Sequence, residues 1–193
     1  MIRVATETDV PAILELYAPF VLTTTATFEY DVPCRKDFMQ RFLTITENFP
    51  WLVWEEEGKI LGYAYASYPY SRAAYRWCAE PSIYIAPEAQ GKGIGRKLYA
   101  ALEAILVEQG IQTLYSIITG ENDGSVKFHE RLGYVHRVTF PNCGYKFGRW
   151  ISVIWMVKRL ISVEIPKSFP TPFRILGQDK QRISDILDSL SLS

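Results

Sequence analysis

The sequence predicts a mixed α/β domain in which an antiparallel group of strands precedes one βαβ crossover. Two observations carry this prediction. Two β-rich runs flank Glu56-Glu57-Gly58-Lys59, which is a hairpin signal. Further along, residues 94–109 place Leu98, Leu102 and Ile105 on one helical face, between two strand-like runs.

The remaining elements follow from the same kinds of signal. Thr8 or Asp9 can cap the first helix, with Pro11 in its first turn. Gly110 and Gly133 end the two later helices. In chain order we expect a strand at 2–5, a helix from residue 8 or 9, a loop at 23–29, a helix at 35–46, strands at 51–55, 60–68 and 79–85, a helix at 94–109, a strand at 113–119, a helix at 122–132, and strands at 134–140 and 151–160.

The composition excludes several classes of protein. The 193 residues are enough for one domain of about 150 residues and a remainder of about 40. Because 21 Lys and Arg balance 21 Asp and Glu, we expect neither nucleic acid nor a membrane as a partner. Two histidines and three scattered cysteines predict no metal site and no disulfide framework. No apolar run is typical of a signal peptide or a membrane span, so we expect a cytoplasmic protein.

The end of the chain is expected to lie outside the main domain. We place that domain at residues 1–160 and a C-terminal extension at 161–193. Two prolines mark a linker at 168–172, and residues 178–190 carry Ile183 and Leu187 at the spacing of a short amphipathic helix. We expect this helix to pack against its own domain or against a dimer partner.

A glycine-rich turn, Gln90-Gly91-Lys92-Gly93-Ile94-Gly95, separates the strand at 79–85 from the helix at 94–109. Glycines allow consecutive backbone N–H groups to point into one concavity, and the helix N-terminus adds a partial positive charge. The turn therefore suits a pyrophosphate. Gly93 follows Lys92 where a Walker A loop needs Ser or Thr, and the third glycine comes one residue too early for a dinucleotide fingerprint.

Two blocks resemble the acetyl-CoA signature of the GNAT (Gcn5-related) N-acetyltransferases. They are Gln90-x-x-Gly93-x-Gly95 and Asn122-x-x-Ser125-Val126-x-Phe128-His129-Glu130-x-Leu132-Gly133-Tyr134. Three further blocks are similar to the phosphinothricin and methionine sulfone/sulfoximine acetyltransferases: Arg72-x-Ala74-Tyr75-x-Trp77-x-x-Glu80, Thr27-Phe28-Glu29 and Gly144-Tyr145-Lys146-x-Gly148-x-Trp150. The resemblance covers about residues 1–160. It implies the GNAT fold, in which a mixed, mostly antiparallel sheet contains a βαβ core that binds acetyl-CoA.

The resemblance implies direct transfer of an acetyl group from acetyl-CoA to an amine. Glu80 is the implied catalytic base, and the apolar residues around it should raise its pKa. His129 is implied to protonate the leaving thiolate, to bind the substrate or to serve as a structural hydrogen-bond donor. Backbone N–H groups of the strand that follows Glu80 are implied to meet the pantetheine arm. The implied acetyl-CoA-binding residues are Ser82, Ile83, Tyr84, Ile85, Gln90, Gly91, Lys92, Gly93, Ile94, Gly95 and Asn122.

The implied acceptor is the amine of a small amino-acid analogue of the methionine sulfone, methionine sulfoximine or phosphinothricin type. Its implied binding residues are Phe28, Glu29, Arg72, Tyr75, Tyr145 and Lys146. An arginine fork suits the carboxylate of such a substrate. A homodimer is also implied. Two alternatives stay open: a GNAT enzyme for a polyamine or a protein N-terminus, and a CoA-binding regulatory module without turnover that docks through the C-terminal helix.

Overall fold

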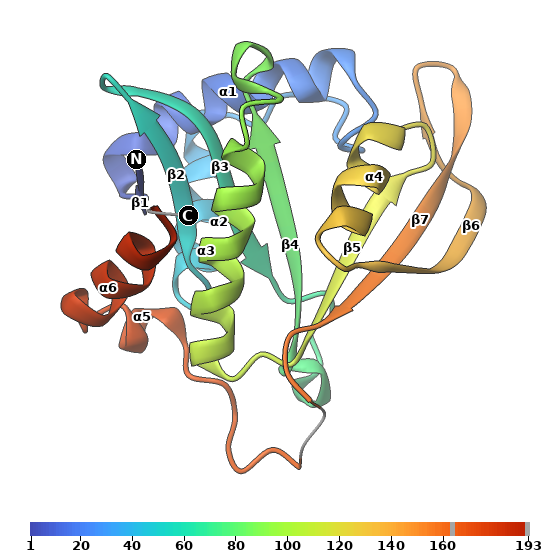
Figure 1. The fold of residues 1–193 in the computed structure, drawn as a ribbon. Helices are drawn as coiled ribbons and strands as arrows, with labels where there is room; N and C mark the ends of the chain where they lie inside the picture. Colours follow the sequence, from blue (N-terminus) through green and yellow to red (C-terminus); the bar gives the residue numbers. More distant parts are fainter. Residues whose placement is uncertain (163–164, 192–193) are drawn as a thin grey trace.

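The computed structural model describes residues 1–162 and 165–191 of the chain. A seven-stranded sheet runs through the described residues in the order β1-β2-β3-β4-β5-β7-β6. Helices cover both of its faces (Figure 1). The pairing of β4 with β5 is parallel, and the other neighbouring strands pair antiparallel. The predicted mixed, mostly antiparallel fold is confirmed.

The elements agree with the predicted ranges to within a few residues, except that β6 continues beyond its predicted end and that the short helix α5 is an addition to the predicted elements. In the described part of the chain, no helix combines the length and the apolar character needed to cross a membrane. The elements are β1 (Ile2–Val4), α1 (Val10–Thr23), α2 (Arg35–Thr46), β2 (Trp51–Glu56), β3 (Lys59–Ser67), β4 (Cys78–Ile85), α3 (Ile94–Gln109), β5 (Thr113–Thr119), α4 (Asp123–Arg131), β6 (Val135–Lys146), β7 (Arg149–Arg159), α5 (Phe173–Leu176) and α6 (Lys180–Ser191).

The alternation of side chains along the first strands divides the core into two clusters. On one face of the sheet, α1 and α2 pack against Trp51 and Val53 of β2. On the other face, α3 packs against Leu52 of the same strand, because successive side chains of a strand point to opposite faces. In β4, Tyr84 packs with the first cluster and Ile83 with the second. The even-numbered residues of β4 therefore face α1 and α2, and the odd-numbered ones face α3.

Strands β4 and β5 separate shortly after they begin. Their parallel ladder has two residue pairs and ends at Ala79 and Leu114, and Figure 1 shows the strands spreading apart beyond that point. The N–H of Ala86 donates to β3. Because the direction of the N–H groups alternates along a strand, those of Ile83 and Ile85 face the gap. The sheet thus has an opening in its middle with backbone donors along one side.

Strand β6 extends beyond the predicted end at Phe140, as far as Lys146. Its pairing with β7 shifts between Phe140 and Gly144, where Asn142 has a positive φ of 50°. Pro141 lacks an N–H, and an edge strand tolerates this. Pro141 and Asn142 at the bulge are typical of turns, so the sequence pattern does not predict that the strand continues beyond them. Tyr145 and Lys146 therefore lie within β6 and not in the connection to β7.

The C-terminal extension packs against the same core as the strands. Phe173, Leu176, Ile183 and Leu187 are buried in the cluster around α3. Helix α6 lies beside α3 and beside β1, the first strand of the chain (Figure 1). The amphipathic helix therefore packs against its own domain, which is one of the two arrangements expected for it. The division of the chain at residue 160 stays a prediction.

Candidate functional site

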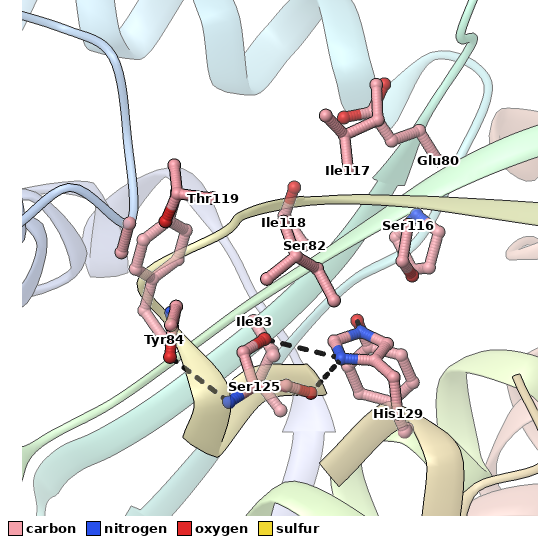
Figure 2. A pocket seen from close by; sticks show the side chains of 14 residues that line it. Glu80, Ser82, Ile83, Tyr84, Ser116, Ile117, Ile118, Thr119, Ser125 and His129 are labelled. Carbon is pink, nitrogen blue, oxygen red and sulfur yellow. Dashed lines mark hydrogen bonds between the residues drawn. The ribbon is translucent and has the colours of Figure 1, made fainter. Parts of the chain in front are cut away.

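A pocket occupies the gap between β4 and β5. Figure 2 shows Glu80 and His129 on opposite sides of it. Its lining comes from two diverging strands, from α3 and from α4, so the pocket exists because the parallel ladder ends early. The lining residues are Ala26, Glu80, Pro81, Ser82, Ile83, Tyr84, Tyr99, Ser116, Ile117, Ile118, Thr119, Asn122, Ser125 and His129.

A groove continues from this pocket to the N-terminus of α3. Gly91 and Gly93 have φ values of 76° and 79°, which side chains rarely adopt. Gly93 caps α3 without a side-chain bond, so the first N–H groups of the helix are open to a ligand. Arg96 and Arg131 line the groove and add positive charge. Glycine backbone, helix dipole and two guanidinium groups together suit a pyrophosphate.

The pocket and the groove share part of their lining and form one continuous cleft. Ile83, Tyr84 and Asn122 border both. Asn122 also accepts a 3.1 Å hydrogen bond from the N–H of Ser125, so it caps α4 while it faces the cleft. The Cβ that Gly95 lacks would lie 3.3 Å from the Phe128 ring, which shows how closely α3 and α4 approach here. The cleft therefore suits an extended ligand that ends in an anionic group.

Glu80 is the only carboxylate among the described residues that line the central pocket. Burial raises the pKa of its carboxyl above the ordinary value of 4.5. Its position on β4 aims it toward the α1 and α2 face, whereas Tyr99 and His129 lie on the α3 and α4 side. The pocket therefore has a carboxylate with a raised pKa on one face of the sheet, and the neutral hydrogen-bonding groups of Tyr99 and His129 on the other.

His129 is held by hydrogen bonds on both ring nitrogens and is only 3% exposed. Nδ1 lies 2.8 Å from the carbonyl oxygen of Ser125, which can only accept, so Nδ1 carries the proton. Nε2 then accepts from the Tyr99 hydroxyl at 2.9 Å. Burial lowers the pKa of His129 from its usual 6.5, which keeps the ring neutral. In this arrangement its N–H is already used, and His129 positions Tyr99 and Ser125 at the pocket. Figure 2 shows Ser125 beside the His129 ring.

The expected acceptor-binding residues do not line this pocket. Lys146 is 1% exposed, and its Nζ donates to the carbonyl oxygens of Val21, Thr24 and Thr27 at 2.8, 2.9 and 2.8 Å. Burial lowers the pKa of the Lys146 ammonium, and the charge of Glu29 offsets this in part. Since all three ammonium protons are used, Lys146 fastens the segment between α1 and α2 to β6.

Phe28 and Glu29 lie on that fastened segment. The Phe28 ring covers Gly144 so closely that a Cβ there would collide with it. Tyr30 adds a bond from its hydroxyl to the Tyr145 carbonyl. Glu29 pairs with Arg41 of α2, while its other carboxylate oxygen, Oε2, is buried without a hydrogen-bond partner. Phe28 and Tyr30 thus attach the segment to β6, and Glu29 Oε2 is an oxygen without a hydrogen-bond donor.

Arg72 and Tyr75 lie on the exposed connection between β3 and β4. The Tyr75 ring contacts Tyr70 at 4.5 Å between centroids. Tyr145 is also exposed and contacts Trp150 at 5.3 Å. The structure therefore brings the expected catalytic residues and all the expected acetyl-CoA-binding residues except Lys92 into one cleft, whereas none of the expected acceptor-binding residues lines it.

Sequence analysis missed several residues of the cleft. Lys92, which was expected to bind the cofactor, is absent from the lining, whereas Arg96 and Arg131 are part of it. Arg131 follows Phe128 by three residues on α4, so helical spacing could have found it. Tyr99 gave no such signal, because its partner is 30 residues away in the chain. Among the described residues, no three His, Cys, Asp or Glu side chains cluster as a metal site would need.

Comparison with known proteins points in one direction. Residues 2–155 match the family model of the acetyltransferase (GNAT) domain. A phosphinothricin N-acetyltransferase of Alcaligenes faecalis is 39% identical, covering 82% of this chain and 82% of the relative. An L-methionine sulfoximine/L-methionine sulfone acetyltransferase of Salmonella typhimurium is 33% identical, covering 82% and 94%. The crystal structure of a phosphinothricin acetyltransferase from Sinorhizobium meliloti with AcCoA has a TM-score of 0.83 and 34% identity, covering 88% and 94%.

Proposed function

Because this chain belongs to the GNAT acetyltransferase family, we propose that it moves acetyl from acetyl-CoA to the amine of a small amino-acid analogue. The single observation that carries the proposal is the cleft itself, in which a half-buried carboxylate and a pyrophosphate-type turn border the split between β4 and β5. Its relatives from Alcaligenes and Salmonella carry the names of phosphinothricin and methionine sulfoximine/sulfone acetyltransferases. Their identity over most of both chains supports the same class of acceptor here.

Two parts of the cleft offer groups that suit acetyl-CoA. The open N–H groups at the start of α3, with Arg96 and Arg131, would hold the pyrophosphate. The gap-facing N–H groups of Ile83 and Ile85 would pair with the pantetheine arm, in place of the missing strand neighbour. When bound, acetyl-CoA supplies the activated acetyl group as a thioester.

Glu80 prepares the acceptor for attack. An amine is protonated at neutral pH, and only its free base is nucleophilic, so Glu80 takes one proton from the ammonium, directly or through a water. Burial raises the pKa of the Glu80 carboxyl, which makes it a stronger base and brings its pKa closer to the operating pH. As the nitrogen bonds to the acetyl carbon, the bond to sulfur breaks, and the extra proton of the nitrogen passes to the departing thiolate, so that the products are the amide and the CoA thiol. Backbone N–H groups of β4 are the donors available to the carbonyl oxygen as its charge grows.

Arg72 and Glu29 are suited to the two charged ends of an amino acid. The guanidinium fork of Arg72 can bind a carboxylate in bidentate fashion and lies on an exposed connection. Glu29 Oε2 is buried without a partner and can accept from an ammonium. His129 orients Tyr99 and Ser125 on the thiol side of the pocket, which supports a positioning role for the ring.

We also propose that the chain forms a homodimer through β6. This strand is the edge of the sheet and runs over twelve residues. A long, apolar edge invites pairing with another chain. The exposed apolar side chains on β6 and at its turn into β7 are Val135, Val138, Phe140, Tyr145, Phe147 and Trp150. Light scattering should give the mass of two chains, and Val138→Lys should reduce it to one.

The test of the proposed function is CoA release across a panel of acceptors. Methionine sulfone, methionine sulfoximine, phosphinothricin, spermidine and a short peptide are each supplied with acetyl-CoA. We expect turnover of the first three and a loss of roughly a hundredfold or more in kcat for Glu80→Gln. Glu57→Gln, at an exposed hairpin tip, is the matched control and should keep full activity. Turnover of spermidine or peptide alone would reject the acceptor class, and a fully active E80Q would reject the base.

A further inference from the structure

The C-terminal extension contacts the connection between β3 and β4 that carries Arg72 and Tyr75. The indole Nε1–H of Trp77 donates to the carbonyl oxygen of Ser168 at 3.2 Å. The Phe169 ring stacks on Trp77 with 5.0 Å between centroids and 22° between planes. Two segments more than ninety residues apart therefore meet at one aromatic stack.

Arg76 strengthens the same contact. Its guanidinium lies 5.8 Å from the Phe169 ring centroid and 6.0 Å from that of Tyr68. It is thus held between a ring at the end of β3 and a ring of the extension. Trp77 and Arg76 are adjacent, so Phe169 touches two successive residues just before β4.

Trp77 connects this contact to the site. Its carbonyl oxygen accepts from the N–H groups of Gln112 and Thr113 at 2.9 and 3.3 Å, which fixes it at the start of β5. Cys78, the next residue, begins β4, the strand that carries Glu80. On the other side, the turn at Ala73–Tyr75 has only short-range backbone bonds of its own. The connection is consequently positioned mainly at Trp77 and through the contact of Tyr70 with Tyr75 and Trp155.

The extension is firm enough to act as a support. Thr171 N–H donates to the Gln109 carbonyl, and the Gln109 side chain donates to the Thr171 carbonyl at 2.8 Å. The same side-chain amide donates to Asn48 at 2.7 Å. Phe173 is buried in the core two residues later. Phe169 is therefore held two residues before a segment that is tied to α3 and α2.

We propose that Phe169 and Ser168 are positioning residues for the acceptor, acting through Trp77 and Arg76 on the connection that bears Arg72 and Tyr75. The inference rests on the proposed function, because it takes that connection to be the acceptor side. The extension lies outside the family match at residues 2–155, so it adds to this enzyme a support that the matched domain does not contain.

The experiment compares steady-state constants of the full-length enzyme with Phe169→Ala. We expect the KM for the acceptor to rise roughly two- to tenfold, the range that the loss of one aromatic stack corresponds to. The KM for acetyl-CoA should stay unchanged, because its cleft lies between β4, α3 and α4. Phe169→Tyr keeps the ring and should restore the acceptor KM. Ile175→Ala is the matched control, since Ile175 is 52% exposed on the same extension.

The pattern of the two KM values decides the outcome. If F169A leaves the acceptor KM unchanged, or raises both KM values together with a fall in Tm, the positioning role is rejected and Phe169 is structural. Arg72→Ala separates this result from a failure of the proposed function. An acceptor KM that responds to R72A but not to F169A keeps the proposed acceptor side and rejects the support. An acceptor KM that responds to neither variant rejects the placement of the acceptor as well.

Discussion

Replacement of Lys146 by methionine tests how the acceptor side of the cleft is held together. Lys146 is buried in β6 and donates to the carbonyl oxygens of Val21 in α1 and of Thr24 and Thr27 in the segment that joins α1 to α2. Methionine has a similar length and no donors, so K146M removes the three bonds and leaves the volume almost filled. The segment with Phe28 and Glu29 then loses its main polar attachment.

The magnitude follows from the bonds and their surroundings. A hydrogen bond from a charged donor contributes about 1.5–3 kcal/mol, so three contribute roughly 5–9 kcal/mol before offsets. Removal of the ammonium also removes the cost of taking a charge out of water, which is on the order of several kcal/mol for a buried ion. The bonds to Thr24 and Thr27 are only partly buried, so those carbonyls can regain water. We expect the free energy of unfolding to fall by about 2–4 kcal/mol.

Two measurements check this prediction. In a chain of this size, each kcal/mol lowers Tm by roughly 2–4 °C, so thermal unfolding should shift down by roughly 5–15 °C. Below the new transition, the acceptor KM should rise more than the acetyl-CoA KM, because Lys146 holds the segment with Phe28 and Glu29, of which only Ala26 lines the acetyl-CoA groove. Lys36→Met, at an exposed position of α2, is the control for loss of one positive charge.

A K146M enzyme with the Tm and acceptor KM of the parent would refute the reasoning. The three bonds would then contribute nothing beyond what water supplies. A lowered Tm with an unchanged acceptor KM would keep the structural role of Lys146 and reject its link to acceptor binding.

Three other substitutions or conditions test separate parts of the cleft. Gly144→Ala places a Cβ inside the Phe28 ring, so we expect a loss of roughly 1–3 kcal/mol in chemical denaturation, which Phe28→Ala in the same chain should reduce. The acid limb of kcat/KM should lie above pH 4.5, because burial raises the pKa of Glu80 and activity is lost as pH falls through that raised value; a pH profile with its limb at or below 4.5 would contradict this. Gly93→Ala forces a side chain onto a φ of 79°, a strain of about 1–2 kcal/mol, and isothermal titration should show weaker binding of acetyl-CoA, with unchanged affinity counting against the turn as the phosphate site.

The sequence predicts the local geometry around the glycine turn well because its determinants are local. The glycine turn, the apolar stripe of α3 and the cap at Asn122 each occupy a few consecutive residues, and the structure places all three as expected. Positive φ at Gly91 and Gly93 and an open helix N-terminus follow directly from residue type. The exception is Lys92, because the side on which an exposed lysine lies depends on the curvature of the turn and not on its composition.

The rest could not be predicted because it depends on contacts between distant segments. Lys146 reaches carbonyls more than a hundred residues earlier in the chain, and no local pattern distinguishes it from a surface lysine near a turn. The bulge in β6 hides the strand that brings it there. Likewise, the hydroxyl of Tyr99 meets His129 only because α3 and α4 pack together. Such pairings are set by the fold and become visible only once it is known.

This difference has a consequence for how the two halves of the site can change. The acetyl-CoA groove is built mainly from β4, the glycine turn, the start of α3 and α4. The proposed acceptor side is assembled from separate segments, which Lys146 holds from β6 and Phe169 holds from the C-terminal extension. Changes at these two supports should move Phe28, Glu29, Arg72 and Tyr75 relative to Glu80, whereas of the groove lining only Phe20 and Ala26 lie next to positions that Lys146 holds. Acceptor preference should therefore shift through residues that never contact the acceptor, while the affinity for acetyl-CoA changes less.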